Sequence, residues 1–146
     1  MEMLQRVRKT DLARNTRQII RNVLRGQTAV VESHGQPEVA IVDIVDYYLQ
    51  RAALHYYSKS PQVDKEAGLS DGDFARATSE EERYSLVLAY YLGEAISLGR
   101  AAELLGLPWV DLRLRLARLG IPLRLGPETI EELRAEIEAL EKWEKR

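Results

Sequence analysis

Cysteine is absent from the 146 residues of this chain, and histidine occurs only as His34 and His55. Without thiols the chain has neither a disulfide framework nor a thiolate metal site, and the histidines lack a glutamate at metal-binding spacing. Ser33, His34 and Asp43 are the residue types of a catalytic triad, but no nucleophile elbow or oxyanion-hole glycine motif accompanies them. A glycine-rich phosphate loop is also lacking. We therefore predict that the protein is not an enzyme and needs no metal or cofactor.

Long apolar runs are lacking as well. The first residues, MEMLQRVRKTDL, do not contain the apolar core of a signal peptide, and no run reaches membrane-spanning length. We therefore expect a cytoplasmic protein with no membrane partner. A chain of 146 residues forms one medium domain or two small ones, and each small one alone would be marginally stable. Self-association is accordingly expected.

The formal net charge of -2 conceals segments of opposite sign. Residues 1–26 carry seven basic and two acidic side chains, and residues 96–125 carry five arginines and two acidic side chains. Residues 127–146 carry seven glutamates and four basic side chains. Because local charge steers a protein toward its partners, the two basic segments favour contact with a polyanion such as DNA.

The first basic segment is predicted to form one helix over residues 10–26, TDLARNTRQIIRNVLRG, with Thr10 as its N-cap and Gly26 as its C-cap. Its arginines recur three or four positions apart, which is the spacing of one helical face. These arginines are Arg14, Arg17, Arg21 and Arg25. The other, buried side is expected to carry the apolar residues Leu12, Ile19, Ile20, Val23 and Leu24.

A small sheet is predicted around this helix. Residues 3–8 alternate as a short strand does, and the β-branched runs TAVVES and EVAIVDI on either side of HGQP predict a hairpin over 28–43. A second helix is predicted from Val45 to about Tyr57. Its inward residues are expected to be Tyr48, Leu49, Ala52 and Ala53.

The middle of the chain is predicted to be a linker. Residues 57–78 are polar and interrupted by proline and glycine, with a short helical turn near 70–74. Ser79 and Glu82 then have the spacing of a capping box at the start of the apolar helix YSLVLAYYLGEAI. Such a helix is expected to be the buried support of the helices after it.

A helix-turn-helix pattern comes next. Ser97 is placed to cap a helix through Leu105, and Gly106 makes the turn. Pro108 is expected at the first position of the next helix, which Gly120 closes. Two short helices joined by a glycine turn have this pattern. The last segment, 127–146, has an apolar stripe that is too short to form a free coiled coil and needs a cover, whether the second module, a second copy or a partner. The stripe consists of Ile130, Leu133, Ile137 and Leu140.

Two surfaces are candidates for DNA binding. The first lies where the strand meets the arginine-striped helix and consists of Arg8, Lys9, Thr10, Arg14, Asn15 and Arg17. Arginine and asparagine make bidentate contacts to guanine and adenine, although a solvated surface is the alternative. The second is the recognition helix 108–119, with Arg113 and Arg115 as its main candidates. Its alternative is a helix used for packing or dimerisation.

The residues up to about Leu54 resemble the Phd/YefM family of antitoxins. The similarity rests on a short strand followed by TDLARNTRQIIRNVLRGQ and TAVVESHGQPEVAIVDIVDYYLQ, with glycines at 26 and 35. The resemblance implies a small α/β module that dimerises through its sheet and reads a palindromic operator. The basic patch of that family maps onto Arg8, Lys9, Arg14, Asn15 and Arg17.

Residues from about Tyr84 to Leu125 are similar to small helix-turn-helix proteins often encoded beside PIN-domain toxins. The matching features are SLGRAAELLGL and RLGIPL. In the Phd/YefM pattern a toxin-binding tail follows the DNA-binding part directly, whereas here a second folded module is predicted. The similarity implies a toxin partner, for which the stripe of Ile130, Leu133, Ile137 and Leu140 is the candidate surface.

The sequence thus predicts an α+β protein of four parts. Residues 1–56 form a Phd/YefM-like dimerisation and DNA-binding module, and 57–78 a linker. Residues 79–126 form an all-α helix-turn-helix module, and 127–146 a C-terminal amphipathic helix. The predicted function is that of a homodimeric antitoxin and autorepressor, with operator DNA and a cognate protein toxin, of the PIN type or another small type, as partners. The alternatives are a transcription regulator with no toxin partner and an interaction scaffold that does not bind DNA.

Overall fold

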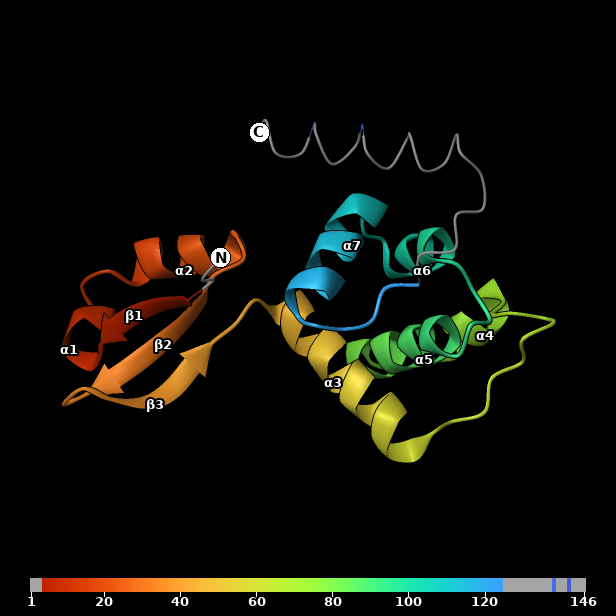
Figure 1. Ribbon diagram of the computed structural model, residues 1–146, viewed down its shortest axis with the longest axis horizontal. Helices are drawn as coiled ribbons and strands as arrows, with labels where there is room; N and C mark the ends of the chain where they lie inside the picture. Colours follow the sequence, from red (N-terminus) through yellow and green to blue (C-terminus); the bar gives the residue numbers. More distant parts are fainter. Residues whose placement is uncertain (1–3, 125–137, 139–141, 143–146) are drawn as a thin grey trace. The chain divides into compact units, whose positions relative to one another are not determined.

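The computed structural model describes residues 4–124 together with 138 and 142, and it divides into two compact units, Met1–Tyr47 and Tyr48–Arg146. The predicted α+β class is confirmed, because a sheet with helices is followed by a helical region (Figure 1). In chain order the elements are β1 (Leu4–Arg8), α1 (Lys9–Leu12), α2 (Thr16–Leu24), β2 (Thr28–Ser33), β3 (Gln36–Ile41), α3 (Ile44–Lys59), α4 (Asp71–Ala75), α5 (Glu80–Leu92), α6 (Leu98–Leu105) and α7 (Trp109–Arg118).

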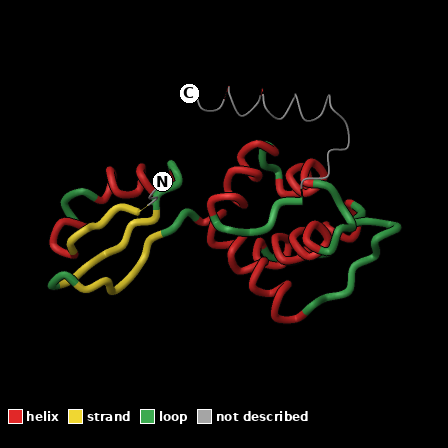
Figure 2. Tube along the Cα trace, viewed as in Figure 1, coloured by secondary structure: helices red, strands yellow, loops and turns green. Residues whose placement is uncertain are grey.

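The sheet of the first unit has the order β1-β2-β3, with β2 in the centre (Figure 2). β1 and β2 are parallel, because α1 and α2 carry the chain back between them. β2 and β3 form the predicted antiparallel hairpin, with a register shift between Val31 and Glu32. Its turn needs two residues of positive φ, which His34 and Gly35 provide at 53° and 76°. Glycine adopts this conformation without steric cost.

The core of the first unit lies between α2 and one face of the sheet. Its buried cluster consists of Val7, Ile19, Val23 and Ala29, against which Leu12 and Ile41 pack. Ile19 and Val23 are four positions apart and therefore lie on the same side of α2. The expectation that Ile20 and Leu24 share this buried side is wrong, because their exposed fractions are 42% and 64%.

The prediction of one helix over 10–26 is also wrong. The chain forms α1 and α2, separated by residues 13–15, and the N-cap of α1 is Arg8 rather than Thr10. The break has a local cause. The hydroxyl of Thr16 donates to the carbonyl oxygen of Leu12 at 2.6 Å, so a side chain takes an acceptor that a continuous helix gives to a backbone N–H.

α3 begins at a capped turn, because the buried Asp43 carboxylate accepts from the backbone N–H groups of Val45 and Asp46 at 2.8 and 3.2 Å. Leu49, Ala52 and Ala53 are buried, as expected, and Tyr48 is half-buried. The Tyr48 ring lies 5.2 Å from that of Tyr84 in α5.

The division between the units falls inside α3, earlier than the boundary predicted after residue 56. The reason is that the buried side of α3 from Tyr48 onward belongs to the helical unit, as the ring contact with Tyr84 shows. The predicted linker, 57–78, contains α4, whose N-cap Ser70 accepts from the N–H of Asp73. This helix corresponds to the short turn expected near 70–74.

The second unit is built around α5, which carries Tyr84, Val87, Leu88, Ala89 and Tyr91 as buried residues. α6 contacts both α5 and α7. The chain turns between α6 and α7 at Gly106, which has a φ of 69°. Pro108 is the N-cap of α7 rather than its first residue. The predicted pair of short helices joined by a glycine turn is therefore present.

Candidate nucleic-acid interface

The six candidates in the first unit come from four consecutive pieces of backbone, and all are exposed. Arg8 ends β1, Lys9 and Thr10 begin α1, and Arg14 and Asn15 lie between α1 and α2. Arg17 lies in the first turn of α2. We call these residues, Arg8, Lys9, Thr10, Arg14, Asn15 and Arg17, the basic cluster. The helix break separates Thr10 from the later members. Of the predicted arginine stripe, Arg17 and Arg21 lie in α2 and Arg25 is its C-cap residue, whereas Arg14 lies before the helix.

Two members of the basic cluster are already held by carboxylates. Nε of Arg8 lies 3.0 Å from Oδ2 of Asp11, and Nζ of Lys9 lies 3.6 Å from Oε2 of Glu38 in β3. All four side chains are at least 31% exposed, so these pairs stabilise the fold only weakly and can be exchanged for phosphate.

The arginines further along differ in this respect. Among the residues that the structure describes, no carboxylate lies within ion-pair distance of four exposed arginines. We call them the open arginines, and they are Arg14, Arg17, Arg21 and Arg25. A guanidinium group without an acidic neighbour offers its full charge and its fork of N–H donors to phosphate or to a guanine edge.

Asn15 lies at the start of α2 among these arginines. It is the N-cap residue, yet its side chain makes no capping hydrogen bond. Its amide is therefore available to a ligand, and the N-terminal end of α2 favours an anion because the helix dipole is positive there. Arg14, Asn15 and Arg17 together can bind a phosphate and the edge of a base.

The candidates on α7 are in a different environment. Arg113 and Arg115 are both half-buried. Nε of Arg115 lies 3.0 Å from Oδ2 of Asp111, and these side chains are only 14% and 24% exposed. Arg115 is thus paired with a carboxylate one helical turn earlier, and little of its side chain is exposed for contact with a groove of DNA.

Two arginines that the sequence did not single out are structural anchors in the second unit. Arg100 donates to the carbonyl oxygen of Leu69 at 3.1 Å and to Oδ1 of Asp71 at 2.7 Å. The bond to Asp71 raises the pKa of Arg100. These contacts join α6 to the start of α4, and no sequence signal could have revealed them because the partners lie about thirty positions apart.

Arg124 is the second anchor. Its backbone N–H donates to the hydroxyl of Tyr91 at 2.9 Å, its guanidinium carbon lies 5.2 Å from the centre of the Tyr91 ring, and a terminal nitrogen donates to the carbonyl oxygen of Ile96. At least three of the five arginines in segment 96–125, Arg100, Arg115 and Arg124, are therefore engaged inside the unit. In segment 1–26, three of the seven basic side chains, Arg6, Arg8 and Lys9, pair with carboxylates of the described residues.

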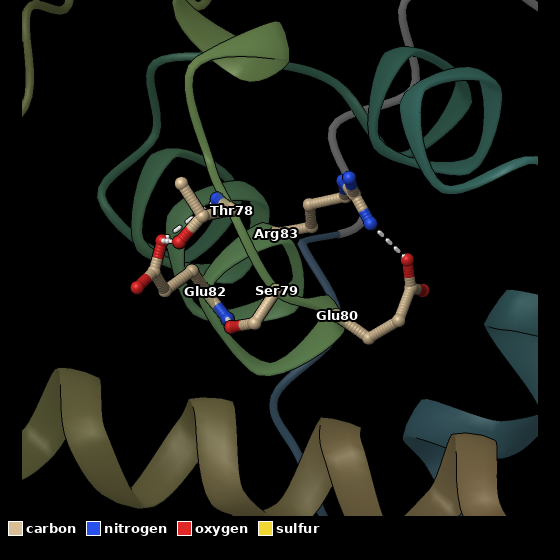
Figure 3. A network of polar contacts seen from close by, with 5 residues as sticks. All are labelled: Thr78, Ser79, Glu80, Glu82 and Arg83. Atoms are coloured by element: carbon tan, nitrogen blue, oxygen red, sulfur yellow. Dashed lines mark hydrogen bonds and ion pairs between the residues drawn. The ribbon is translucent and has the colours of Figure 1, made fainter.

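The start of α5 shows how the fold positions a charged side chain (Figure 3). Ser79 accepts from the N–H of Glu82 at 3.1 Å, as the capping box predicts. The Glu82 carboxylate accepts from the N–H and the hydroxyl of Thr78, both at 2.9 Å, rather than from the N–H of Ser79. These bonds lower the pKa of Glu82, and Arg83 pairs with Glu80 beside it.

The remaining candidates lie elsewhere. Ile130, Leu133, Ile137 and Leu140, the predicted toxin-binding stripe, are outside the described residues, as is most of segment 127–146. Among the residues that the structure does describe, no group of acidic and histidine side chains could hold a metal ion. In the same part of the chain, no helix is both long and apolar enough to span a bilayer.

Fold and site together define a small α+β module with an exposed basic cluster, joined to a helical module with a helix-turn-helix pattern. Residues 72–142 match the model of an uncharacterised protein family, UPF0175. This match starts in α4 and includes α5, α6 and α7. No curated protein and no solved structure matches the chain. The Phd/YefM resemblance of the first 54 residues lies outside the matched segment and stays a prediction.

Proposed function

We propose that the protein is the antitoxin of a toxin–antitoxin pair, a cytoplasmic homodimer that represses its own promoter and neutralises a protein toxin. The observation that carries the DNA-binding part is the environment of the open arginines. They are exposed and have no carboxylate partner within the described residues, whereas Arg115 is engaged by Asp111. The resemblance of the residues from about Tyr84 to Leu125 to small helix-turn-helix proteins often encoded beside PIN-domain toxins supports the toxin-related part.

In the proposed complex the basic cluster reads DNA. Arg14, Asn15 and Arg17 meet base edges and the nearest phosphates, because arginine and asparagine make the bidentate contacts that distinguish guanine and adenine. Arg21 and Arg25 lie one to two turns further along and meet only phosphates. Two copies related by a two-fold axis would place two such clusters about 34 Å apart, one turn of DNA, on a palindromic operator.

The experiment measures binding to a fragment of the protein's own promoter over a range of salt concentrations. Each phosphate contact that is lost lowers the slope of log affinity against log salt by about 0.9, so the double variant Arg14→Ala, Arg17→Ala is expected to lower it by about 2. The matched control is Arg113→Ala, Arg115→Ala, which removes the same charge from α7. An unchanged affinity in the first variant and a large loss in the second would transfer the DNA site to α7.

The toxin is tested separately, by co-expression and pull-down with the product of the neighbouring gene. Deletion of residues 127–146 is expected to preserve promoter binding and to abolish neutralisation. If the neighbouring product does not bind, the protein is a regulator with no toxin partner. A failure to shift any promoter fragment at low salt would instead favour an interaction scaffold.

A further inference from the structure

The exposed side of α2 combines arginines with large apolar side chains. The opposite side of this helix packs on one face of the sheet (Figure 1). Away from that core, Ile20 and Leu24 are 42% and 64% exposed, and Arg17 and Arg21 are exposed beside them. At about 100° per residue these four side chains fall within an arc of roughly 100°. We call the four residues, Arg17, Ile20, Arg21 and Leu24, the α2 face.

The amide side chains next to the α2 face are engaged within the first unit. Nε2 of Gln18 donates to Oδ1 of Asn22, and Nδ2 of Asn22 donates to Oε1 of Gln5 in β1, both at 3.0 Å. Nε2 of Gln5 donates in turn to the carbonyl oxygen of Ile19 at 3.1 Å. These bonds tie α2 to β1 and so fix which side of the helix is exposed. Beyond the first turn of α2, contacts to a ligand therefore fall to the α2 face.

Ile20 is the apolar member of the α2 face that lies nearest the residues proposed to read bases. It follows Arg17 by three positions, about 4.5 Å along the helix axis, whereas Leu24 follows Arg17 by about 10 Å. The shorter distance is close to the step of about 3.4 Å between successive base pairs. In the major groove the apolar group that a base edge presents is the 5-methyl group of thymine.

We propose that Ile20 determines specificity by contacting the 5-methyl group of a thymine next to the base that Arg17 reads. The inference rests on the proposed DNA binding and deepens it, because it names a base that the site prefers. Apolar contact with the methyl group selects thymine, since adenine, guanine and cytosine present no methyl group in the groove. The neighbouring arginines supply the attraction to phosphate, which does not depend on sequence.

A protein is the other class of partner for an exposed apolar surface. The charge of α2 favours DNA, because its sequence, TRQIIRNVL, contains no acidic residue and the described residues supply no carboxylate partner to Arg17 or Arg21. A second copy of the chain on this face would bring its own arginines against these two. An acidic protein partner is distinguished from DNA by the test that follows.

The test uses the full chain and the stretch of its own promoter that it protects from cleavage. Each thymine of this stretch is replaced singly by uracil, which lacks only the 5-methyl group. At one thymine in each half-site the replacement is expected to lower affinity about fourfold, the factor for burial of one methyl group. In Ile20→Ala the same replacement is expected to leave affinity unchanged.

Two further variants are the controls. Leu24→Ala shortens the other apolar side chain of the α2 face and is expected to keep the full effect of uracil, because Leu24 lies beyond the base contacts. Ile20→Val keeps a branched apolar side chain and is expected to retain most of the effect. Circular dichroism checks that the variants are folded, as expected for substitutions at exposed positions.

Two results would overturn the inference. If Ile20→Ala weakens binding to the thymine and uracil fragments by the same factor, Ile20 acts through the fold or through a protein contact. If uracil is tolerated at every position, no methyl group is read. In both cases promoter binding that depends on Arg14 and Arg17 would still support the proposed function. Absence of promoter binding would contradict the proposed function and the inference with it.

Discussion

The two units of the protein use the same residue type in opposite ways. In the first unit Arg14 and Arg17 are exposed and no carboxylate of the described residues pairs with them. In the second, Arg100 bridges α6 and α4, Arg115 is held by Asp111, and Arg124 lies against Tyr91. Both segments are basic by composition, so charge alone would not distinguish them. Whether an arginine is available to a ligand therefore depends on which side chains lie next to it in the folded chain.

The two groups of arginines differ in the free-energy cost of replacing a carboxylate partner by phosphate. An exposed ion pair contributes little, since water and salt compete with it, so a phosphate can displace the carboxylate of Lys9 or Arg8. A half-buried pair has lost part of its hydration, and removal of either partner leaves a poorly solvated charge. DNA binding by Arg115 would therefore require its pair with Asp111 to break, whereas Arg14 has no carboxylate partner among the described residues.

The largest expected effect concerns the core of the second unit and tests whether the two units are independent. Leu88 in α5 is 1% exposed, and Leu88→Ala is expected to lower the unfolding free energy of this unit by about 3 kcal/mol, from lost burial and the cavity left behind. Promoter affinity, measured below the melting range, is expected to stay unchanged because the first unit has a core of its own. A parallel loss of affinity would show that the two units do not act separately.

The matched control for this prediction is Leu24→Ala. Leu24 is 64% exposed on α2, so the substitution is expected to change stability by no more than about 0.5 kcal/mol. Thermal unfolding followed by circular dichroism measures both variants.

An intermediate effect is expected when one carboxylate is removed from each unit. Glu38→Gln removes the ion-pair partner of Lys9. The variant is expected to raise DNA affinity at low salt by up to about fivefold, the factor that corresponds to the free energy of a surface ion pair. The salt slope should become steeper by about 1, for one additional phosphate contact. Asp111→Asn removes the same charge beside Arg115, and affinity is expected to remain within about twofold. Equal gains in DNA affinity from both variants would show that the affinity depends only on the net charge of the protein.

The smallest effect is a pH dependence in the second unit. Since the pKa of Glu82 is lowered in the folded protein, the bonds from Thr78 stabilise the fold above the ordinary glutamate pKa. This contribution is lost as the pH falls through the lowered value. Glu82→Gln is therefore expected to melt at a slightly lower temperature than the parent at neutral pH, and the difference should vanish in acid. Glu81→Gln, in the same turn, is the control. An equal change in melting temperature in this variant would show that the hydrogen bonds from Thr78 are not the cause.

Much of the architecture could be predicted from local sequence. Ser70, Ser79 and Ser97 mark the starts of α4, α5 and α6, because a serine hydroxyl accepts from a free N–H of the first turn. The hairpin turn and the left-handed Gly106 follow equally from short-range sterics. Errors arose where a side chain competed with the backbone, as Thr16 does at the break between α1 and α2.

The candidate site was predictable only in part. The members of the basic cluster are close in sequence, so their proximity in space follows from three adjacent elements. Which of them are engaged could not be predicted, since the partner of Lys9 lies in β3, far along the chain. The burial of Arg115 and the anchoring of Arg100 depend likewise on packing between helices.

Local sequence alone was enough to specify strand alternation, helix caps, glycine turns and two segments rich in arginine. Tertiary packing was needed for the division inside α3, the exposure of Ile20 and the contrast between Arg14 and Arg115. The reason is the separation along the chain of the residues that interact. Caps, turns and the pair of Arg115 with Asp111 join residues a few positions apart, whereas burial and the pairs of Lys9 with Glu38 and of Arg100 with Asp71 depend on side chains that only folding brings together.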